Sequence, residues 1–185
     1  MKLLDRVLQS WRARHAAVWV PHGARLLDVG CADGMLLRTL APRLTRAVGV
    51  DPDAETAVGA GYEIVRGHFP GAPAFAPESF DCVTLLAVLE HVADPDALAR
   101  ECHRVLAPGG RVVLTVPHPV VDRILEIAIR LRVLDGMETE AHHGFDPSVT
   151  DAVFEGAGFV KVADRRFQLG LNRLFVFERS ISRPS

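Results

Sequence analysis

The chain has 185 residues, of which 49% are hydrophobic and 24% charged, and its formal net charge is −2. This length is typical of one domain that buries enough surface to fold without a disulfide or a structural metal. The small net charge, with basic residues dispersed along the sequence, disfavours binding to nucleic acid.

The first half of the sequence alternates between helical and strand patterns. Apolar residues at helical spacing predict an N-terminal helix over residues 3–20, closed by Pro21-His22-Gly23. Five apolar-rich segments are typical of buried strands: 25–29, 47–50, 62–65, 82–86 and 111–116. Helices are expected between them at 35–40, near 54–58, and from the Asp94 cap to about Leu106. This alternation predicts a parallel sheet covered on both faces.

After Pro117 the pattern changes. Residues 120–134 are expected to form an apolar-rich helix and residues 135–145 a polar loop. Asp146-Pro147 is expected to cap a short helix that ends near 156–158. The runs 159–167 and 171–177, joined by Gln168-Leu169-Gly170, then predict a β-hairpin.

Cysteine usage and hydropathy bear on the compartment. The three cysteines, Cys31, Cys82 and Cys102, show no C-x-x-C spacing, which favours a reducing compartment. The sequence lacks the run of about 18 uncharged apolar residues that a membrane-spanning helix requires. We therefore expect a cytoplasmic protein without a membrane span.

The most informative segment is LLDVGCADG, residues 26–34, in which a strand enters a turn with two glycines and a helix follows. Glycine permits positive φ and close approach of a ligand, and the helix N-terminus presents unpaired N–H groups. Asp51 ends the next strand, where a carboxylate can accept hydrogen bonds from ribose hydroxyls. Asp51 could instead cap the following segment, as could Asp53. The pattern indicates a nucleotide-type ligand.

Four segments in order, LLDVGCADG, VGVDPD, FDCVTLLAVLEHVADPDAL and ECHRVLAPGGRVVLTVP, resemble the successive motifs of class I S-adenosylmethionine-dependent methyltransferases. The resemblance is closest to the type-11 branch, which includes quinone-biosynthesis methyltransferases, and covers residues 25 to about 180. It implies a single-domain, Rossmann-like three-layer α/β fold whose mostly parallel, seven-stranded sheet ends in an antiparallel hairpin. The implied parts are an N-terminal helix (1–22), a cofactor-binding half (23–116), a substrate-covering insert (117–150), and a C-terminal helix and hairpin (151–185).

The resemblance also implies which residues hold S-adenosylmethionine. Those expected at its methionine portion are Asp28, Gly30, Cys31, Ala32 and Gly34. Asp51 would hold the ribose, with Pro52 beside the adenine. Gly67-His68-Phe69 would lie against the adenine edge, and Leu86-Ala87-Val88 under the sulfonium. The chain departs from the family pattern where Ala32 replaces a glycine and His68 replaces the aspartate that binds the adenine amino group, so the adenine contact stays open.

Methyl transfer from a sulfonium requires mainly alignment and a dry site, and an acceptor with a weakly acidic proton also needs a general base. His91, which matches the histidine of the family's L-E-H-V motif, and His118, at the end of the fifth predicted strand, are the candidates. His91 could instead fix its loop through hydrogen bonds together with Glu90. We expect no metal site, because His118, His142 and His143 lack acidic or cysteine partners at a metal-binding spacing.

Acceptor specificity is expected in the N-terminal helix and in residues 117–150, which lie outside the shared motifs. The expected helix at 120–134 has so wide an apolar face that it either packs into the core or covers a pocket. A covering helix would imply a small acceptor of apolar or lipid-like character.

Two other functions stay open at this point. An NAD(P)-dependent oxidoreductase shares the glycine-rich turn and the acidic strand end, but the G-x-G-x-x-G pattern is absent from residues 28–34. A non-catalytic S-adenosylmethionine-binding regulator would keep the same motifs without turnover.

Overall fold

A single sheet organises the chain in the computed structural model, which describes residues 3–117 and 147–181. The described strands follow the order β3-β4-β2-β1-β5-β6-β8-β7. Five run parallel: β1 (Arg25–Val29), β2 (Arg46–Asp51), β4 (Tyr62–Arg66), β5 (Phe80–Leu86) and β6 (Leu106–Pro117). Three are antiparallel to a neighbour: β3 (Ala57–Gly59), β7 (Phe159–Phe167) and β8 (Asn172–Arg179).

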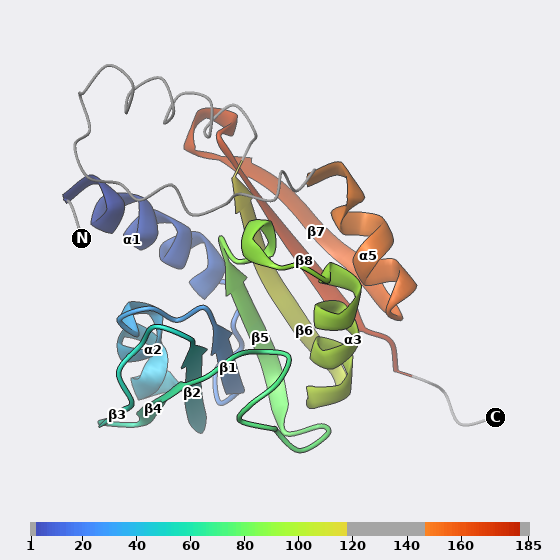
Figure 1. Cartoon of the computed structure of the whole chain (residues 1–185). Coiled ribbons are helices and arrows are strands. Elements are labelled where there is room, and N and C mark those ends of the chain that lie inside the picture. The colour runs from blue at the N-terminus through green and yellow to red at the C-terminus, as the bar shows by residue number, and fades with distance from the viewer. Residues whose placement is uncertain (1–2, 118–146, 182–185) are drawn as a thin grey trace.

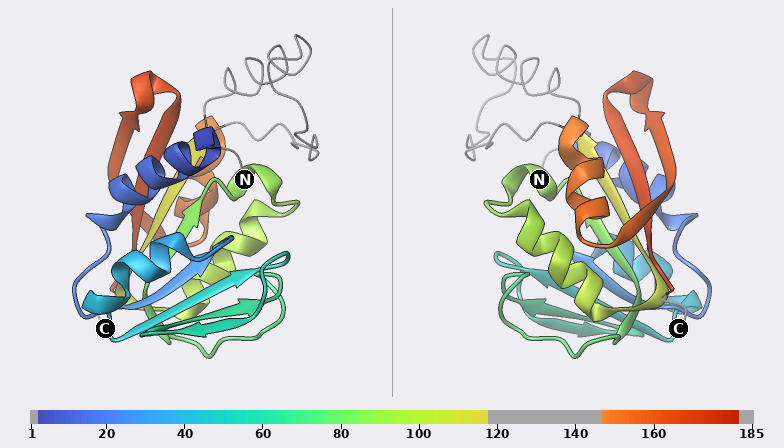
Figure 2. Two further views of the ribbon diagram at one scale, coloured as in Figure 1. Left: turned by 90° about the vertical axis from the view of Figure 1, so that its left-hand side faces the viewer. Right: turned by 90° about the vertical axis from the view of Figure 1, so that its right-hand side faces the viewer.

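Helices cover both faces of this sheet, which confirms the expected three-layer α/β architecture (Figures 1 and 2). One face carries α1 (Leu3–Ala17) and α2 (Met35–Leu40), and the other carries α3 (Pro95–Val105) and α5 (Thr150–Gly156). Short 3₁₀ turns complete the described chain: η1 (Ala41–Arg43), η2 (Leu89–His91), η3 (Pro147–Val149) and η4 (Gln168–Gly170). Among the described helices, none combines the length and apolar character that crossing a bilayer requires.

Alternate residues of the central strands supply two cores, one on each face. In β1, Leu26 packs with the α1 and α2 side chains, whereas Leu27 packs with those of α3 and α5. Both leucines are fully buried. This arrangement explains why the strands read as continuous apolar runs: a parallel sheet covered by helices has no solvent face.

The start of α3 follows the predicted chemistry. Asp94 Oδ1 accepts a hydrogen bond of 2.8 Å from the Ala97 backbone N–H, and Pro95 occupies the first turn. The end differs slightly from expectation, because β6 begins at Leu106 rather than at Arg111. Leu106 pairs with Phe80 and Arg111 with Cys82, so residues 107–110 form an irregularity within the strand.

The prediction of a short helix near residues 54–58 was wrong. Residues 57–59 instead form β3, whose Ala57 pairs with Ile64 and whose Gly59 pairs with Tyr62 of β4. Gly61, with φ +83°, lies in the turn between β3 and β4. The segment between β2 and this turn is too short to form a stable helix. β3 therefore adds an eighth strand to the seven expected, at the edge opposite the confirmed β7–β8 hairpin.

Two further expectations concern the C-terminal half. The helix expected after Asp146-Pro147 starts as the 3₁₀ turn η3, and α5 itself begins at Thr150. The helix expected at 120–134 and the loop at 135–145 lie outside the described residues, as does most of the expected insert 117–150.

Candidate functional site

The site lies at the carboxyl ends of β1, β2 and β5, where the chain order reverses. From β1 the sheet extends through β2 and β4 on one side and through β5 and β6 on the other. Such a switch point leaves a crevice between the loops that follow the strands. Two pockets occupy it, and both include Gly30.

The larger pocket, here called the β2-side pocket, has a volume of about 290 Å³. Its walls come from the ends of β1 and β2, from the loop after β4, and from the turn after β5. The lining residues are Val29, Gly30, Val50, Asp51, Pro52, Asp53, Gly67, His68, Phe69, Ala87, Val88, His91 and Val92.

Asp51 is held at the end of β2 by backbone donors. Its Oδ2 accepts from the Ala32 N–H at 2.9 Å, and its Oδ1 accepts from the N–H groups of Asp53 at 2.9 Å and Ala54 at 3.1 Å. The last two bonds supply the capping role considered from the sequence, although no helix follows. A carboxylate offers about four acceptor positions, so about one is left toward the pocket.

The loop after β4 brings His68 and Phe69 to the pocket. The Gly67 N–H donates to the Asp51 carbonyl oxygen at 3.0 Å, which continues the pairing of β2 and β4. Behind this loop, the Phe69 ring lies 6.3 Å from that of Phe75, which in turn lies 5.3 Å from that of Phe80. This aromatic row anchors the loop to β5.

A sharp turn ends β5 and presents Val88 to the pocket. Ala87 has φ +58°, a conformation that costs free energy for a residue with a side chain. Its N–H donates to the Thr115 carbonyl oxygen at 3.0 Å, which holds the turn in place. His91 lines the same pocket with an exposed side chain, whereas Glu90 is buried.

Gly30 lines both pockets. Its φ is +69°, and an added Cβ would lie 2.5 Å from Val88 Cγ2. Any side chain at residue 30 would therefore both strain the backbone and collide with Val88.

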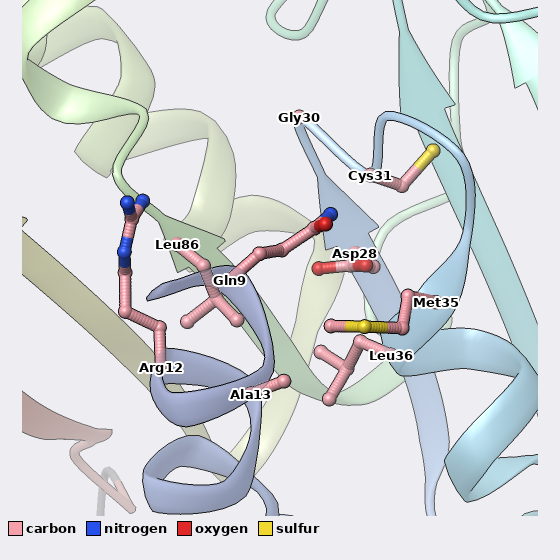
Figure 3. Close-up of a pocket in the computed structure, with 9 residues that line it drawn as sticks. All are labelled: Gln9, Arg12, Ala13, Asp28, Gly30, Cys31, Met35, Leu36 and Leu86. Atoms are coloured by element: carbon pink, nitrogen blue, oxygen red, sulfur yellow. The ribbon is translucent and has the colours of Figure 1, made fainter. Parts of the chain in front are cut away.

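The smaller pocket, here called the α1-side pocket, has a volume of about 40 Å³ and lies between α1, α2 and the ends of β1 and β5 (Figure 3). Its lining residues are Gln9, Arg12, Ala13, Asp28, Gly30, Cys31, Met35, Leu36 and Leu86. Figure 3 shows the Gln9 amide extending toward the Asp28 carboxylate. Gln9 Oε1 is buried without a hydrogen-bond partner, which is costly unless a ligand supplies a donor.

Asp28 is the carboxylate that lines the α1-side pocket. Its side chain is only 3% exposed, and Oδ1 accepts a hydrogen bond of 2.6 Å from Thr84 Oγ1. Burial raises the pKa of Asp28 to about 7; the Thr84 hydrogen bond opposes this rise and the charge of Asp51 adds to it. A cationic ligand group bound beside Asp28 would favour the ionised form of this carboxylate and pair with it.

Cys31 is not suited to act as a nucleophile. Burial, reinforced by the negative charges of Asp28 and Asp51, raises the pKa of its thiol to about 12. Cys82 and Cys102 are likewise free and buried. Cys31 therefore contributes shape and apolar surface to the α1-side pocket.

The structure brings most of the expected site residues together. Asp51, Pro52, residues 67–69, Ala87, Val88 and His91 line the β2-side pocket, and Asp28, Cys31 and Leu86 line the α1-side pocket. Ala32 and Gly34 line neither. Ala32, with φ +46°, acts through its N–H bond to Asp51, and Gly34 packs against Ile64. His118 lies outside the described residues.

Gln9 and Arg12 were missed from the sequence. They lie on α1, and Ser10 Oγ of that helix contacts Met35 Sδ of α2 at 3.5 Å. Buried Ala13 and Ala16 pack α1 onto the sheet. Helical periodicity predicted α1 but carried no signal that it crosses the end of β1.

Comparison with known proteins gives one family and several relatives. A family model described as a methyltransferase domain matches residues 2–163. The ubiquinone biosynthesis O-methyltransferase of Pseudomonas entomophila (strain L48) is 39% identical over 99 residues, which cover 49% of this chain and 43% of that protein. The protein of the same name from Pseudomonas syringae pv. tomato is 37% identical with the same coverage. The chain thus spans less than half the length of these curated relatives.

Solved structures share the fold at lower identity. An S-adenosylmethionine dependent methyltransferase from Mesorhizobium loti has a TM-score of 0.72 and 18% identity, covering 90% of this chain and 96% of that one. The [4+2]-cyclase SpnF has a TM-score of 0.69 and 13% identity, covering 92% of this chain and 82% of that one. At such identities the similarity shows the fold alone.

Proposed function

The chain belongs to the family of methyltransferase domains, and from that premise we propose that it transfers a methyl group from S-adenosylmethionine to a hydroxyl oxygen of a small acceptor. The oxygen is chosen because two relatives are named as O-methyltransferases. Because the match covers only 43% of each of these relatives, their activity and acceptor are carried to this chain as proposals.

One observation carries the proposal: two pockets of different chemistry meet at Gly30. The β2-side pocket offers a carboxylate for a diol, Asp51, and apolar walls at Phe69 and Val88. The α1-side pocket offers Asp28 and the unpartnered Gln9 Oε1 for an ammonium group. A ligand that carries a ribose at one end and an amino acid at the other fits this division.

The residues present therefore fit S-adenosylmethionine. Asp51 would hold the ribose, His68 and Phe69 the adenine, and Asp28 with Gln9 the amino group. Arg12 would face the carboxylate of the same methionine portion. When bound, the cofactor supplies a methyl group already activated for displacement, so the protein needs chiefly to align the acceptor.

His91 is the residue proposed to accept the hydroxyl proton. It lies at the rim of the β2-side pocket, beside Val88, and imidazole exchanges protons near neutral pH. An acceptor hydroxyl that loses its proton to His91 becomes a stronger nucleophile. Substitution by glutamine keeps a hydrogen-bonding group and removes this proton transfer, so His91→Gln should lower turnover while cofactor affinity is kept.

The finer features of the acceptor and the location are also proposals. We propose an apolar acceptor, on the basis of the relatives' names and the apolar pocket walls at Val88 and Leu86. We propose a reducing, cytoplasmic location, supported by three buried free cysteines.

The first experiment is calorimetric titration of the protein with S-adenosylhomocysteine, with NAD as a comparison ligand. Asp51→Asn should weaken binding of S-adenosylhomocysteine by about tenfold or more, because a charged acceptor to the diol is lost. Asp53→Asn is the matched control, since Asp53 lines the same pocket and should change affinity little. Tight binding of NAD alone would contradict the cofactor assignment.

Turnover needs a separate assay. Transfer of labelled methyl from S-adenosylmethionine should be followed with phenolic acceptors of increasing apolar size. Products that carry the label on oxygen support the proposal. Cofactor binding without transfer to any acceptor would favour the non-catalytic regulator considered from the sequence.

A further inference from the structure

A further cavity lies on the other side of α1, and the proposed function does not use it. This cavity, here called the hairpin pocket, lies between the C-terminal end of α1, with the turn that follows it, and the β7–β8 hairpin. Its volume of about 310 Å³ is in the range of pockets that hold small organic ligands. The lining residues are His15, Val18, Trp19, Arg165, Arg166, Phe167 and Leu174.

The hairpin pocket is separate from the candidate cofactor site. Leu86, in the α1-side pocket, pairs with Thr115, and Thr115 pairs with Leu174 of the hairpin pocket. Two strand spacings, about 10 Å, therefore separate the two pockets along the sheet. Helix α1 lies between them, with Ala13 on one side and His15 on the other.

Aromatic and aliphatic groups form much of the wall. Phe167 and Leu174 are buried, with 8% and 2% of their surface exposed. The His15 ring lies against Phe167, with ring centroids 4.5 Å apart and a tilt of 39°. Trp19 adds a second aromatic surface from the turn that follows α1. A flat apolar body could stack against such walls.

The charged side chains that line the hairpin pocket are the arginines Arg165 and Arg166. The Arg165 guanidinium carbon lies 5.7 Å from the centroid of the Trp19 ring. Within residues 3–117 and 147–181, neither Arg165 nor Arg166 forms an ion pair at contact distance; Asp164 pairs with Arg173 and feels the charge of Arg166 only from further away. No aspartate or glutamate of the described chain lines the pocket. Unpaired guanidinium groups beside apolar surface attract anions.

We propose that the hairpin pocket binds a small organic anion with a flat apolar body, of the aromatic carboxylate class. The carboxylate pairs with Arg165, whose planar guanidinium matches its geometry, and the ring packs between Trp19 and the floor formed by Phe167 and Leu174. This site does not depend on the proposed function, because it shares no residue with the two pockets of the cofactor crevice.

The test is calorimetric titration of the whole chain with 2-naphthoate, in the presence of saturating S-adenosylhomocysteine. 2-Naphthamide, which has the same shape without the charge, is the comparison ligand. We expect naphthoate to bind at least about tenfold more tightly than naphthamide, and Arg165→Gln to abolish most of that difference. Arg100→Gln, an exposed arginine of α3 across the sheet, should leave both affinities unchanged.

A second pair of variants keeps the test independent of Arg165. Val18 is 77% exposed, so Val18→Glu and Val18→Gln should both fold. The glutamate places a negative charge at the pocket and should weaken naphthoate binding by about tenfold relative to the glutamine. The proposal is overturned if naphthoate fails to bind while S-adenosylhomocysteine saturates the cofactor crevice, if it binds no better than naphthamide, or if both Val18 variants bind alike.

Discussion

Replacement of Asp28 by asparagine tests the electrostatics of the α1-side pocket most directly. Folding raises the pKa of Asp28 from 3.8 to about 7, chiefly by burial. The folded state therefore binds this proton more tightly than the unfolded state between those two values. The resulting stabilisation is fully present below about pH 4 and is lost as the pH rises through about 7.

The size of the effect follows from the linkage relation. Each pH unit within that window changes the free energy of unfolding by about 1.4 kcal/mol, so the full shift corresponds to about 4 kcal/mol. Between about pH 5 and about pH 8.5, wild type should lose about 3 kcal/mol relative to Asp28→Asn. Asparagine is isosteric, and its Oδ1 still accepts the hydrogen bond from Thr84 Oγ1, so packing is preserved.

The assay is urea unfolding of both proteins across this pH range without added ligand. Titrating groups that do not interact with Asp28 contribute equally to both proteins and cancel in the difference. Thr84→Val serves as a control. It removes the hydrogen bond that lowers the pKa of Asp28, so the loss of stability with rising pH should continue to higher pH in this variant than in wild type. A difference between wild type and Asp28→Asn that stays constant with pH would refute the argument from burial.

Three remaining predictions concern Gly30, the start of α3 and cofactor binding. Gly30→Ala should lower the free energy of unfolding by at least about 1–2 kcal/mol, because φ is +69° and the new Cβ would meet Val88. In urea unfolding, adding Val88→Ala should recover only the part of this loss that is due to the contact. Asp94→Ala should cost about 1 kcal/mol by removing the bond to the Ala97 N–H, whereas Asp96→Ala, at the second residue of α3, should cost less. Affinity for S-adenosylhomocysteine should fall as the pH drops below about 7, because Asp28 is then protonated and no longer pairs with the ligand's ammonium group. Calorimetric titration of Asp28→Asn should show a weaker affinity that no longer varies over this range.

Local patterns determined much of this fold from the sequence. The strand 25–29, the turn at Gly30 and the carboxylate of Asp51 follow from short-range rules, because a buried strand, a positive φ and a strand end each restrict which residues occur nearby. The same holds for Asp94-Pro95 at the start of α3 and for the terminal hairpin. These features lie where the sequence analysis placed them.

Tertiary packing decided the rest, because it joins residues whose separation in the chain leaves no local pattern. Only the crossing of α1 over the end of β1 brings Gln9 to Asp28, and the burial that results raises the pKa of Asp28. Residues 57–59 became a strand because β4 offered them hydrogen bonds, not because of their composition. Arg165 and Trp19 meet across the pocket for the same reason. The sequence alone thus determined the elements and the motif at the cofactor crevice, whereas long-range contacts determined its second wall and the hairpin pocket.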